Sequence, residues 1–318
     1  MSEHWQQRPE GGGRFALWLI RFIGLHFGRH FSRAFLYPIT LYFFFRRGPE
    51  RRSSYDYLRR VLGRPANAWQ VMRLIHAFAC TTLDRVFLLA RGLKGFRITT
   101  HGLEHLHAML DGGTSVMLLG AHVGSFEVQR VLATQRPQYK LKLVMDKSKM
   151  PALTDLLEAL APDLADNIID ASRGGTDVVL ALSEAAQTGA MVAMLGDRGR
   201  AHEAMRSVPF LGEPAPFPAA PWLIASTLNL PVLMCIGLYR GGNRYELVFE
   251  PLAERVVLPR ENRQAALDGY IGTYAARLEH HVREAPYNWF NFYDFWHPQP
   301  NSVREPAAAV PLHHADAK

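Results

Sequence analysis

The chain has 318 residues, of which 48% are hydrophobic and 20% are charged, a balance that excludes a largely disordered protein. The net charge of +7 lies entirely in residues 1–60, where eleven arginines and no lysine accompany four acidic residues. The two cysteines, Cys80 and Cys235, fall in apolar segments without metal-ligand spacing. They predict buried thiols in a reducing compartment rather than a disulfide framework.

Residues 15–45 form an arginine-rich apolar segment. Its longest uncharged run, residues 34–45, is shorter than the roughly 20 residues that a membrane-spanning helix needs. Arginines inside the apolar region also argue against a signal peptide. The mixture of arginine and aromatic residues favours helices lying on an anionic membrane surface. The alternative is a helix pair packed on the core with its arginines in water. No nucleic-acid-binding signature accompanies the basic residues, so we expect no nucleic-acid partner.

Helices are predicted next at residues 51–62 and 68–89, and after Gly92 short β-rich runs alternate with helical runs. This alternation predicts an α/β fold with a mostly parallel central sheet of about seven strands and helices on both faces. The expected strands are residues 96–100, 115–121, 140–145, 167–170, 190–195, 232–239 and 245–250. The expected helices between and after them are residues 126–132, 152–160, 177–186, 221–228 and 260–283.

Three regions follow from these patterns. Residues 1–92 are expected to form a basic and apolar helical region, with helices that associate with a membrane. Residues 93–300 are expected to form one α/β catalytic domain, and residues 301–318, rich in alanine, a disordered tail.

His122 and Glu127 lie where an apolar strand turns into a helix, with Gly124 between them. Inside one helix, five positions would separate two side chains by about 140° around the axis. With His122 on the turn and Glu127 in the first helical turn, the two side chains can meet. A histidine beside a carboxylate can act as a general base whose tautomer the carboxylate fixes. The alternative is a core histidine satisfied by a nearby acid.

Other charged groups follow neighbouring strands, at the edge where α/β proteins bind ligands. Arg198 and Arg200 come after the strand at 190–195, and they either bind a phosphate or oxyanion or pair with a carboxylate such as Asp197. Arg173 and Gly174 open a helix, where they either help to hold an anion or belong to a plain helix cap. Lys147, after a further strand, is either simply solvated or a contributor to binding at the same rim, which it borders.

Two aromatic segments complete the pattern. Residues 208–218 contain four prolines and predict an ordered loop that walls a hydrophobic channel. Residues 287–296 hold seven aromatics, which either seal the core or contact an acyl chain or a membrane.

These segments together resemble the bacterial lipid A biosynthesis (late) acyltransferase family, within the lysophospholipid acyltransferase superfamily. The resemblance rests on the arginine-rich apolar N-terminus and on the segments GAHVGSFE, LGDRG, VPFLGEPAPFP and LPVL. The family signature H-x4-D/E falls on His122 and Glu127. The turn reads HVGSFE where the lipid A enzymes usually have HFGNWE, and the ending NWFNFYDFW also departs from theirs. The chain is therefore similar to a side branch found with pigment, aryl polyene or other non-lipid-A pathways.

The resemblance implies an O-acyltransferase that moves a fatty acyl group from acyl carrier protein, or acyl-CoA, to a hydroxyl of a membrane lipid or glycolipid. It implies catalytic roles for His122, Glu127 and Arg198. The positions of Arg173, Gly174, Arg200 and Lys147 at strand ends make them the candidates for phosphate or substrate binding. No cofactor and no metal are expected. The expected location is the cytoplasmic face of the bacterial inner membrane, peripheral or monotopic. The expected partners are the carrier protein, the lipid acceptor and an anionic membrane surface.

Two other classes of function remain open from the residues. The same histidine and carboxylate activate water equally well, which would make the protein an acyl ester or thioester hydrolase. The chain has no G-x-S-x-G elbow, which disfavours a serine hydrolase. The third class is a non-catalytic membrane-binding module that has kept the fold.

Overall fold

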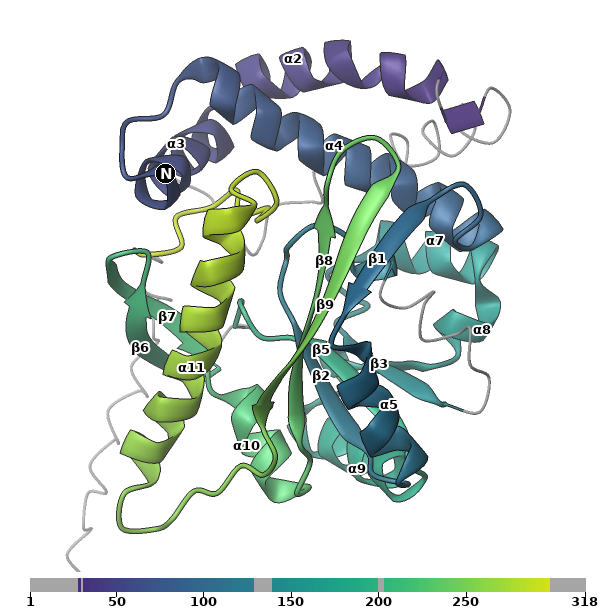
Figure 1. Cartoon of the computed structure of the whole chain (residues 1–318), viewed down its shortest axis with the longest axis vertical. Coiled ribbons are helices and arrows are strands. Elements are labelled where there is room, and N and C mark those ends of the chain that lie inside the picture. The colour runs from purple at the N-terminus through teal and green to yellow at the C-terminus, as the bar shows by residue number, and fades with distance from the viewer. Residues whose placement is uncertain (1–27, 30, 129–138, 200–202, 298–318) are drawn as a thin grey trace, which may run out of the picture.

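The computed structural model describes residues 28–29, 31–128, 139–199 and 203–297, and its centre is one seven-stranded sheet (Figure 1). The strands of this sheet are β1 (Arg97–His101), β2 (Val116–Gly120), β3 (Leu141–Met145), β4 (Ile168–Asp170), β5 (Met191–Leu195), β8 (Val232–Tyr239) and β9 (Arg244–Ala253). Across the sheet their order is β1-β9-β8-β2-β5-β3-β4. Neighbours are parallel except β8 and β9, which form an antiparallel pair. The predicted fold class and all seven predicted strands are confirmed.

The helices match most of the predicted helical segments. They are α2 (Leu36–Arg46), α3 (Gly48–Leu62), α4 (Ala68–Arg91), α5 (Leu103–Asp111), α7 (Pro151–Leu160), α8 (Pro162–Ala165), the short 3₁₀ turn η2 (Ala171–Arg173), α9 (Gly175–Gln187), α10 (Ala220–Thr227) and α11 (Arg263–Glu284). The helix predicted at 126–132 is helical at 126–128. Its remaining residues lie outside the described part of the chain, as does the tail at 301–318.

Helices cover both faces of the sheet. Successive side chains of a strand point to opposite faces, so one strand contributes to two clusters. On β2, Met117 and Leu119 belong to a cluster that includes residues of α10 and α11. Val116 and Leu118 belong to a second cluster, which includes residues of α5. All four side chains are buried. The strand is therefore continuously apolar, as expected of a parallel strand between two helical layers.

The N-terminal helices pack on the sheet through α4, which begins with a capping box between Asn67 and Gln70. Fully buried Asp84 on α4 binds Arg29 through both carboxylate oxygens, at 2.7 and 2.8 Å. Arg33 and the hydroxyl of Tyr245, on β9, also donate to Asp84, at 3.1 and 2.8 Å. The carboxylate therefore ties the arginine-rich segment to α4 and to the sheet.

Within the described ranges, no helix combines the length and the apolar character needed to cross a bilayer. The helix in the predicted apolar segment, α2, has 11 residues. Cys80 and Cys235 are free buried thiols, as predicted.

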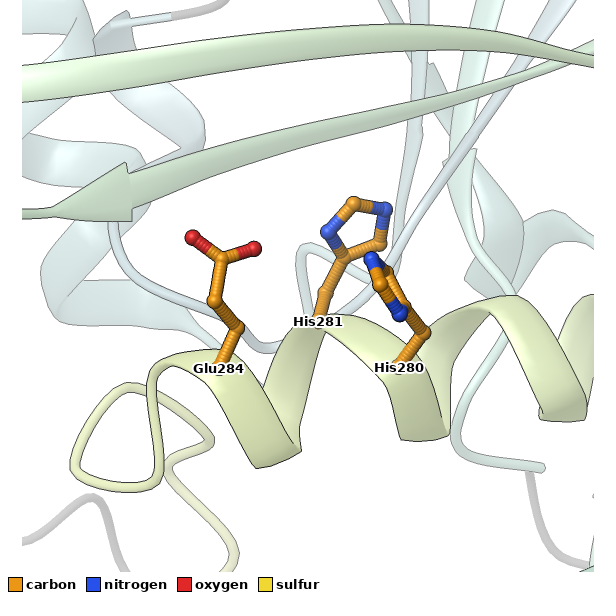
Figure 2. Close-up of side chains that lie close together, drawn as sticks. All are labelled: His280, His281 and Glu284. Atoms are coloured by element: carbon orange, nitrogen blue, oxygen red, sulfur yellow. The ribbon is translucent and has the colours of Figure 1, made fainter.

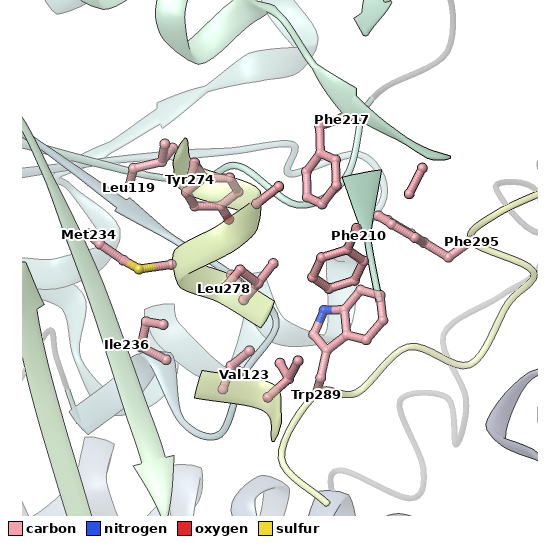
Figure 3. Packing of buried hydrophobic residues seen from close by; sticks show 14 of the residues in the cluster. Leu119, Val123, Phe210, Phe217, Met234, Ile236, Tyr274, Leu278, Trp289 and Phe295 are labelled. Atoms are coloured by element: carbon pink, nitrogen blue, oxygen red, sulfur yellow. The ribbon is translucent and has the colours of Figure 1, made fainter. Parts of the chain in front are cut away.

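The proline-rich segment differs from the prediction. It forms an antiparallel hairpin of β6 (Met205–Phe210) and β7 (Glu213–Pro218) instead of a loop. The fully buried rings of Phe210 and Phe217 pack with Trp289 and Phe295 in the cluster of Figure 3. These residues of the two aromatic segments are therefore core. The prolines are tolerated because β6 and β7 form a separate two-stranded sheet. Each strand is an edge strand, so many of its positions need no backbone N–H for pairing.

Gly124 makes a close approach of two backbones possible. It has a φ of +61°, and a Cβ there would lie 1.9 Å from the carbonyl oxygen of Gly237 on β8. The next residue, Ser125, donates its N–H to that same oxygen at 2.7 Å. The turn after β2 is therefore pressed against β8.

We expect Gly124→Ala to lower the free energy of unfolding by more than about 2 kcal/mol, because it combines a left-handed backbone with a steric overlap. Gly63→Ala is the matched control, since Gly63 has a φ of +66° but open space around its Cβ position. It should cost about 1 kcal/mol. Urea unfolding of both variants measures the difference, and equal losses would show that the contact with β8 contributes nothing.

Candidate active site

The register of β2 and β5 brings two polar residues together at the carboxyl edge of the sheet. Gly120 pairs with Leu195, and the N–H of Gly196 donates to the carbonyl of Gly120 at 2.9 Å. His122 and Asp197 each follow the paired residue of their strand by two positions. The parallel pairing therefore sets the imidazole and the carboxylate opposite each other.

Asp197 is fully buried and accepts three hydrogen bonds. Its Oδ1 accepts from Nδ1 of His122 at 2.8 Å. Its Oδ2 accepts from the backbone N–H of His122 and from Nε1 of Trp289, each at 3.0 Å. Because an ionised carboxylate only accepts, this contact assigns the ring proton to Nδ1 and leaves the lone pair on Nε2. The side chain of His122 is 29% exposed, so the ring is accessible to a ligand.

The environment favours a neutral imidazole beside an ionised acid. Burial lowers the pKa of His122 below its ordinary value, and the positive charge of Arg198 lowers it further. Burial alone would raise the pKa of the Asp197 carboxyl, but the interactions with His122, Arg198 and Trp289 outweigh it and hold that pKa below its ordinary value. At neutral pH the site therefore contains an uncharged base next to a carboxylate.

The segment after α11 holds the histidine turn in place. The N–H of Phe290 donates to the carbonyl of His122 at 2.9 Å, and the N–H of Gly124 donates to the carbonyl of Asn288 at 2.8 Å. Trp289, between them, is fully buried and reaches Asp197. The backbone of the turn at His122 is therefore fixed by residues more than 160 positions later in the chain, and Trp289 holds the Asp197 carboxylate that orients its side chain.

Glu127 lies in a different set of contacts from the predicted one. It is 3% exposed, its Oε1 is 2.8 Å from Nε of Arg85 on α4, and Oγ of Ser125 donates to its Oε2 at 3.4 Å. The spacing of the two residues predicts Glu127 as the acid that orients His122, whereas Asp197 is the residue at Nδ1. The positive charge of Arg85 also contributes to the lowered pKa of His122. A catalytic role for Glu127 stays a prediction.

The positive charge of Arg198 acts on the imidazole of His122 by lowering its pKa. Its Nη2 donates to the carbonyl of Phe290 at 2.6 Å, and its guanidinium carbon lies 5.2 Å from the ring centroid of Tyr293. Its Nε is buried without a hydrogen-bond partner among the described residues. The alternative of a simple ion pair with Asp197 does not appear among these contacts, although the two charges interact. Arg198 therefore has an N–H that no contact of the described residues uses.

The other predicted residues do not contact His122 in the described part of the chain. Lys147 follows β3, and Arg173 and Gly174 follow β4, which are two and three strands from β2. At about 4.8 Å per strand, this is about 10 and 14 Å along the same edge. The carboxylate of Asp170 accepts from the backbone N–H groups of Ser172 and Lys147 and so caps the short turn η2. The helix α9 that follows Gly174 has no side-chain cap, and anion binding at its start stays a prediction. Arg200 lies outside the described residues.

The charge environment of His122 gives a testable titration. We expect its pKa, followed by the ring-proton NMR signal that disappears in His122→Gln, to lie below the ordinary value of about 6.5. Arg198→Gln removes a nearby positive charge and should move the pKa upward, because the imidazolium is then less disfavoured. Arg97→Gln, an exposed change on the edge strand β1, is the control and should leave it in place. An unchanged pKa in Arg198→Gln would contradict the assigned proximity.

Fold and site together are those of an α/β enzyme built around an oriented histidine. More specifically, residues 89–297 match the family model of the bacterial lipid A biosynthesis acyltransferases. This match covers more than half of the chain, so the protein belongs to that family and is an acyltransferase, which confirms the predicted resemblance. Comparison with curated protein sequences gave no match.

Proposed function

We propose that the protein is a membrane-surface O-acyltransferase that moves a fatty acyl group from an acyl carrier protein or acyl-CoA to a hydroxyl of a lipid or glycolipid. The observation that carries the proposal is the hydrogen bond from Nδ1 of His122 to Asp197, which leaves Nε2 free to accept a proton. Membership of the acyltransferase family supports the reaction type. No cofactor enters the proposed reaction.

The proposed reaction uses His122 twice. Its Nε2 takes the proton of the acceptor hydroxyl while the oxygen attacks the thioester carbonyl, and Asp197 stabilises the imidazolium that forms. The tetrahedral intermediate then breaks its C–S bond, and the imidazolium returns the proton to the departing thiolate. An oxygen ester and a free thiol result, so atoms and charges balance.

Arg198 is the proposed donor to the developing oxyanion. Its buried Nε has no hydrogen-bond partner among the described residues, and its Nη2 is anchored on Phe290. A donor that is already fixed needs no reorganisation when negative charge appears on the carbonyl oxygen. Glu127 would act indirectly in this scheme, by pairing with Arg85, whose charge contributes to the lowered pKa of His122.

The proposed membrane surface is the outer side of the N-terminal helices. Among the residues that the structure describes, eight of the eleven exposed large hydrophobic residues lie between positions 31 and 78: Phe31, Phe35, Tyr37, Leu41, Tyr42, Phe45, Trp69 and Phe78. Exposed Arg46 and Arg52 accompany them. Aromatic rings inserted at the interface, with cations facing lipid headgroups, are the features of a peripheral membrane protein. We propose the cytoplasmic face of the bacterial inner membrane as the location.

The double change Tyr42→Ser and Phe45→Ser should weaken binding to vesicles that contain phosphatidylglycerol by about tenfold or more, because two exposed rings are lost. The fold should stay intact, since neither ring is buried. Leu180→Ser on α9 is the matched control, as Leu180 is 61% exposed but lies outside this surface. Vesicle co-sedimentation measures both. Equal binding by the double variant and wild type would remove the assignment of this surface.

The reaction itself is tested by incubating purified protein with acyl carrier thioester or acyl-CoA, with and without a lipid extract. Transfer to lipid that requires the extract supports the proposal, and the better donor identifies the co-substrate. Release of free fatty acid without any acceptor dependence would make the protein a hydrolase. If neither donor is turned over while vesicle binding is normal, the protein would be a non-catalytic membrane-binding module. If an acidic carrier is the donor, added salt should weaken the step by screening its attraction to basic residues.

A further inference from the structure

The end of α11 brings together three side chains of metal-binding type. His280, His281 and Glu284 rise from the same side of the helix (Figure 2), and one potential ligand atom of each lies within 4.8 Å of the others. His280 and Glu284 are exposed and four positions apart, which places them one above the other on the helix surface. His281 is buried next to them, with its ring centroid 5.1 Å from that of His280.

The contacts of His281 leave one ring nitrogen for a ligand. Its Nε2 lies 3.1 Å from Oε1 of Glu250 on β9. Because the carboxylate accepts, Nε2 carries the proton and Nδ1 has the lone pair. This Nδ1 is buried and has no hydrogen-bond partner in the described ranges, and the whole residue is only 3% exposed. In Figure 2 one ring nitrogen of His281 lies on the side that faces Glu284.

Glu250 is placed as the outer partner of a metal ligand. Histidines that bind metals almost always donate their second ring N–H to a carboxylate or carbonyl, which fixes the tautomer and the ring orientation. Glu250 is itself held by Arg277 through two hydrogen bonds of 2.7 and 2.9 Å. The buried histidine is therefore already oriented, with an unpaired lone pair, before any ion arrives.

We propose that His280, His281 and Glu284 bind a divalent transition metal ion, for which Zn²⁺ is the probe of choice. Two imidazoles and a carboxylate are a set of ligands that Zn²⁺ accepts, with water in the fourth position. A tetrahedral ion with bonds of about 2.1 Å separates its ligand atoms by about 3.4 Å. The exposed side chains of His280 and Glu284 therefore need to close by little more than about 1 Å. Arg240 donates to Oε1 of Glu284, and Oε2 is the oxygen assigned to the ion.

This metal site is separate from the catalytic residues of the proposed reaction. It lies at the end of α11, just before the segment that contacts the turn at His122. The helix ends at Glu284, and residues 288–290 then contact the histidine turn of the active site. An ion that joins two consecutive turns at this end of α11 would fix the point from which that segment departs. The expected effect is a structural one, namely greater stability of the folded protein.

The experiment uses the full chain, stripped with EDTA and dialysed, and titrates Zn²⁺ against a chromogenic chelator. We expect one zinc equivalent per chain. His280→Gln and Glu284→Gln should each weaken binding by at least about tenfold, since loss of even an outer partner of a metal ligand costs about 10- to 100-fold. Both positions are exposed, so neither change should unfold the protein. His105→Gln, an exposed histidine on α5, should bind zinc as wild type does.

Thermal unfolding gives an independent readout. Zn²⁺ should raise the Tm of wild type and of His105→Gln, because an ion that binds only the folded state stabilises it. It should raise the Tm of His280→Gln much less. Wild-type protein that binds no zinc at micromolar concentration would overturn the proposal, and so would equal zinc affinity in wild type, His280→Gln and Glu284→Gln.

Discussion

His122→Ala is expected to lower kcat for acyl transfer by about 10² to 10⁴-fold, the usual contribution of a positioned general base. The imidazole is partly exposed, so its removal leaves no large internal cavity. The Tm and the circular dichroism spectrum should therefore stay close to wild type. The measurement is the transfer of a labelled acyl group from whichever donor, acyl carrier thioester or acyl-CoA, proves the better one in the incubation.

His105→Ala is the matched control for this experiment, because it removes an exposed histidine from α5. Its rate should equal that of wild type. Wild-type turnover in His122→Ala would end the assignment of a general base at this position, whatever the family membership.

Asp197→Asn is also expected to have a large effect. It should lower kcat by up to about 10⁴-fold. The asparagine oxygen can still accept from Trp289 and from the backbone of His122. Its NH₂ group then faces Nδ1 of His122, which must become the acceptor. The ring proton moves to Nε2, and the base is lost although the shape of the site is kept.

The ring nitrogen chemical shifts of His122 distinguish this effect from simple destabilisation. In wild type Nε2 should be the unprotonated nitrogen, and in Asp197→Asn it should be Nδ1. Glu127→Gln should keep the wild-type tautomer and lose much less activity, because Glu127 pairs with Arg85. Asp163→Asn, an exposed change on α8, is the control. A larger loss of kcat in Glu127→Gln than in Asp197→Asn would restore Glu127 as the orienting acid.

The strands were predictable from the sequence because their signals are local. Most are short apolar runs bounded by turn residues, and alternation with helices indicates parallel pairing. The turn at His122 was predictable for the same reason, since Gly124 interrupts the pattern between strand and helix. The hairpin of β6 and β7 was not, because its four prolines oppose a strand in any local assessment.

The partners of His122 depend on the order of strands in the sheet, which no local pattern contains. Asp197 was noticed only as a neighbour of Arg198, and the adjacency of β2 and β5 is what makes it the acid at Nδ1. Arg85 and Trp289 had no chemical signal in their own segments. A usable signal was present for Asp197: two strands that both end in polar residues are expected to place them at one edge.

The hydrogen bonds that Arg29 and Arg33 donate to Asp84 have a consequence for any version of the protein shortened at its N-terminus. A chain that starts after Arg33 would leave this carboxylate fully enclosed, with Tyr245 as its remaining donor among the contacts described above. An enclosed charge without its counterion costs about 3 to 5 kcal/mol. The segment that carries Arg29 and Arg33 is therefore an integral part of the folded domain. Removing it to improve solubility should yield a protein that aggregates.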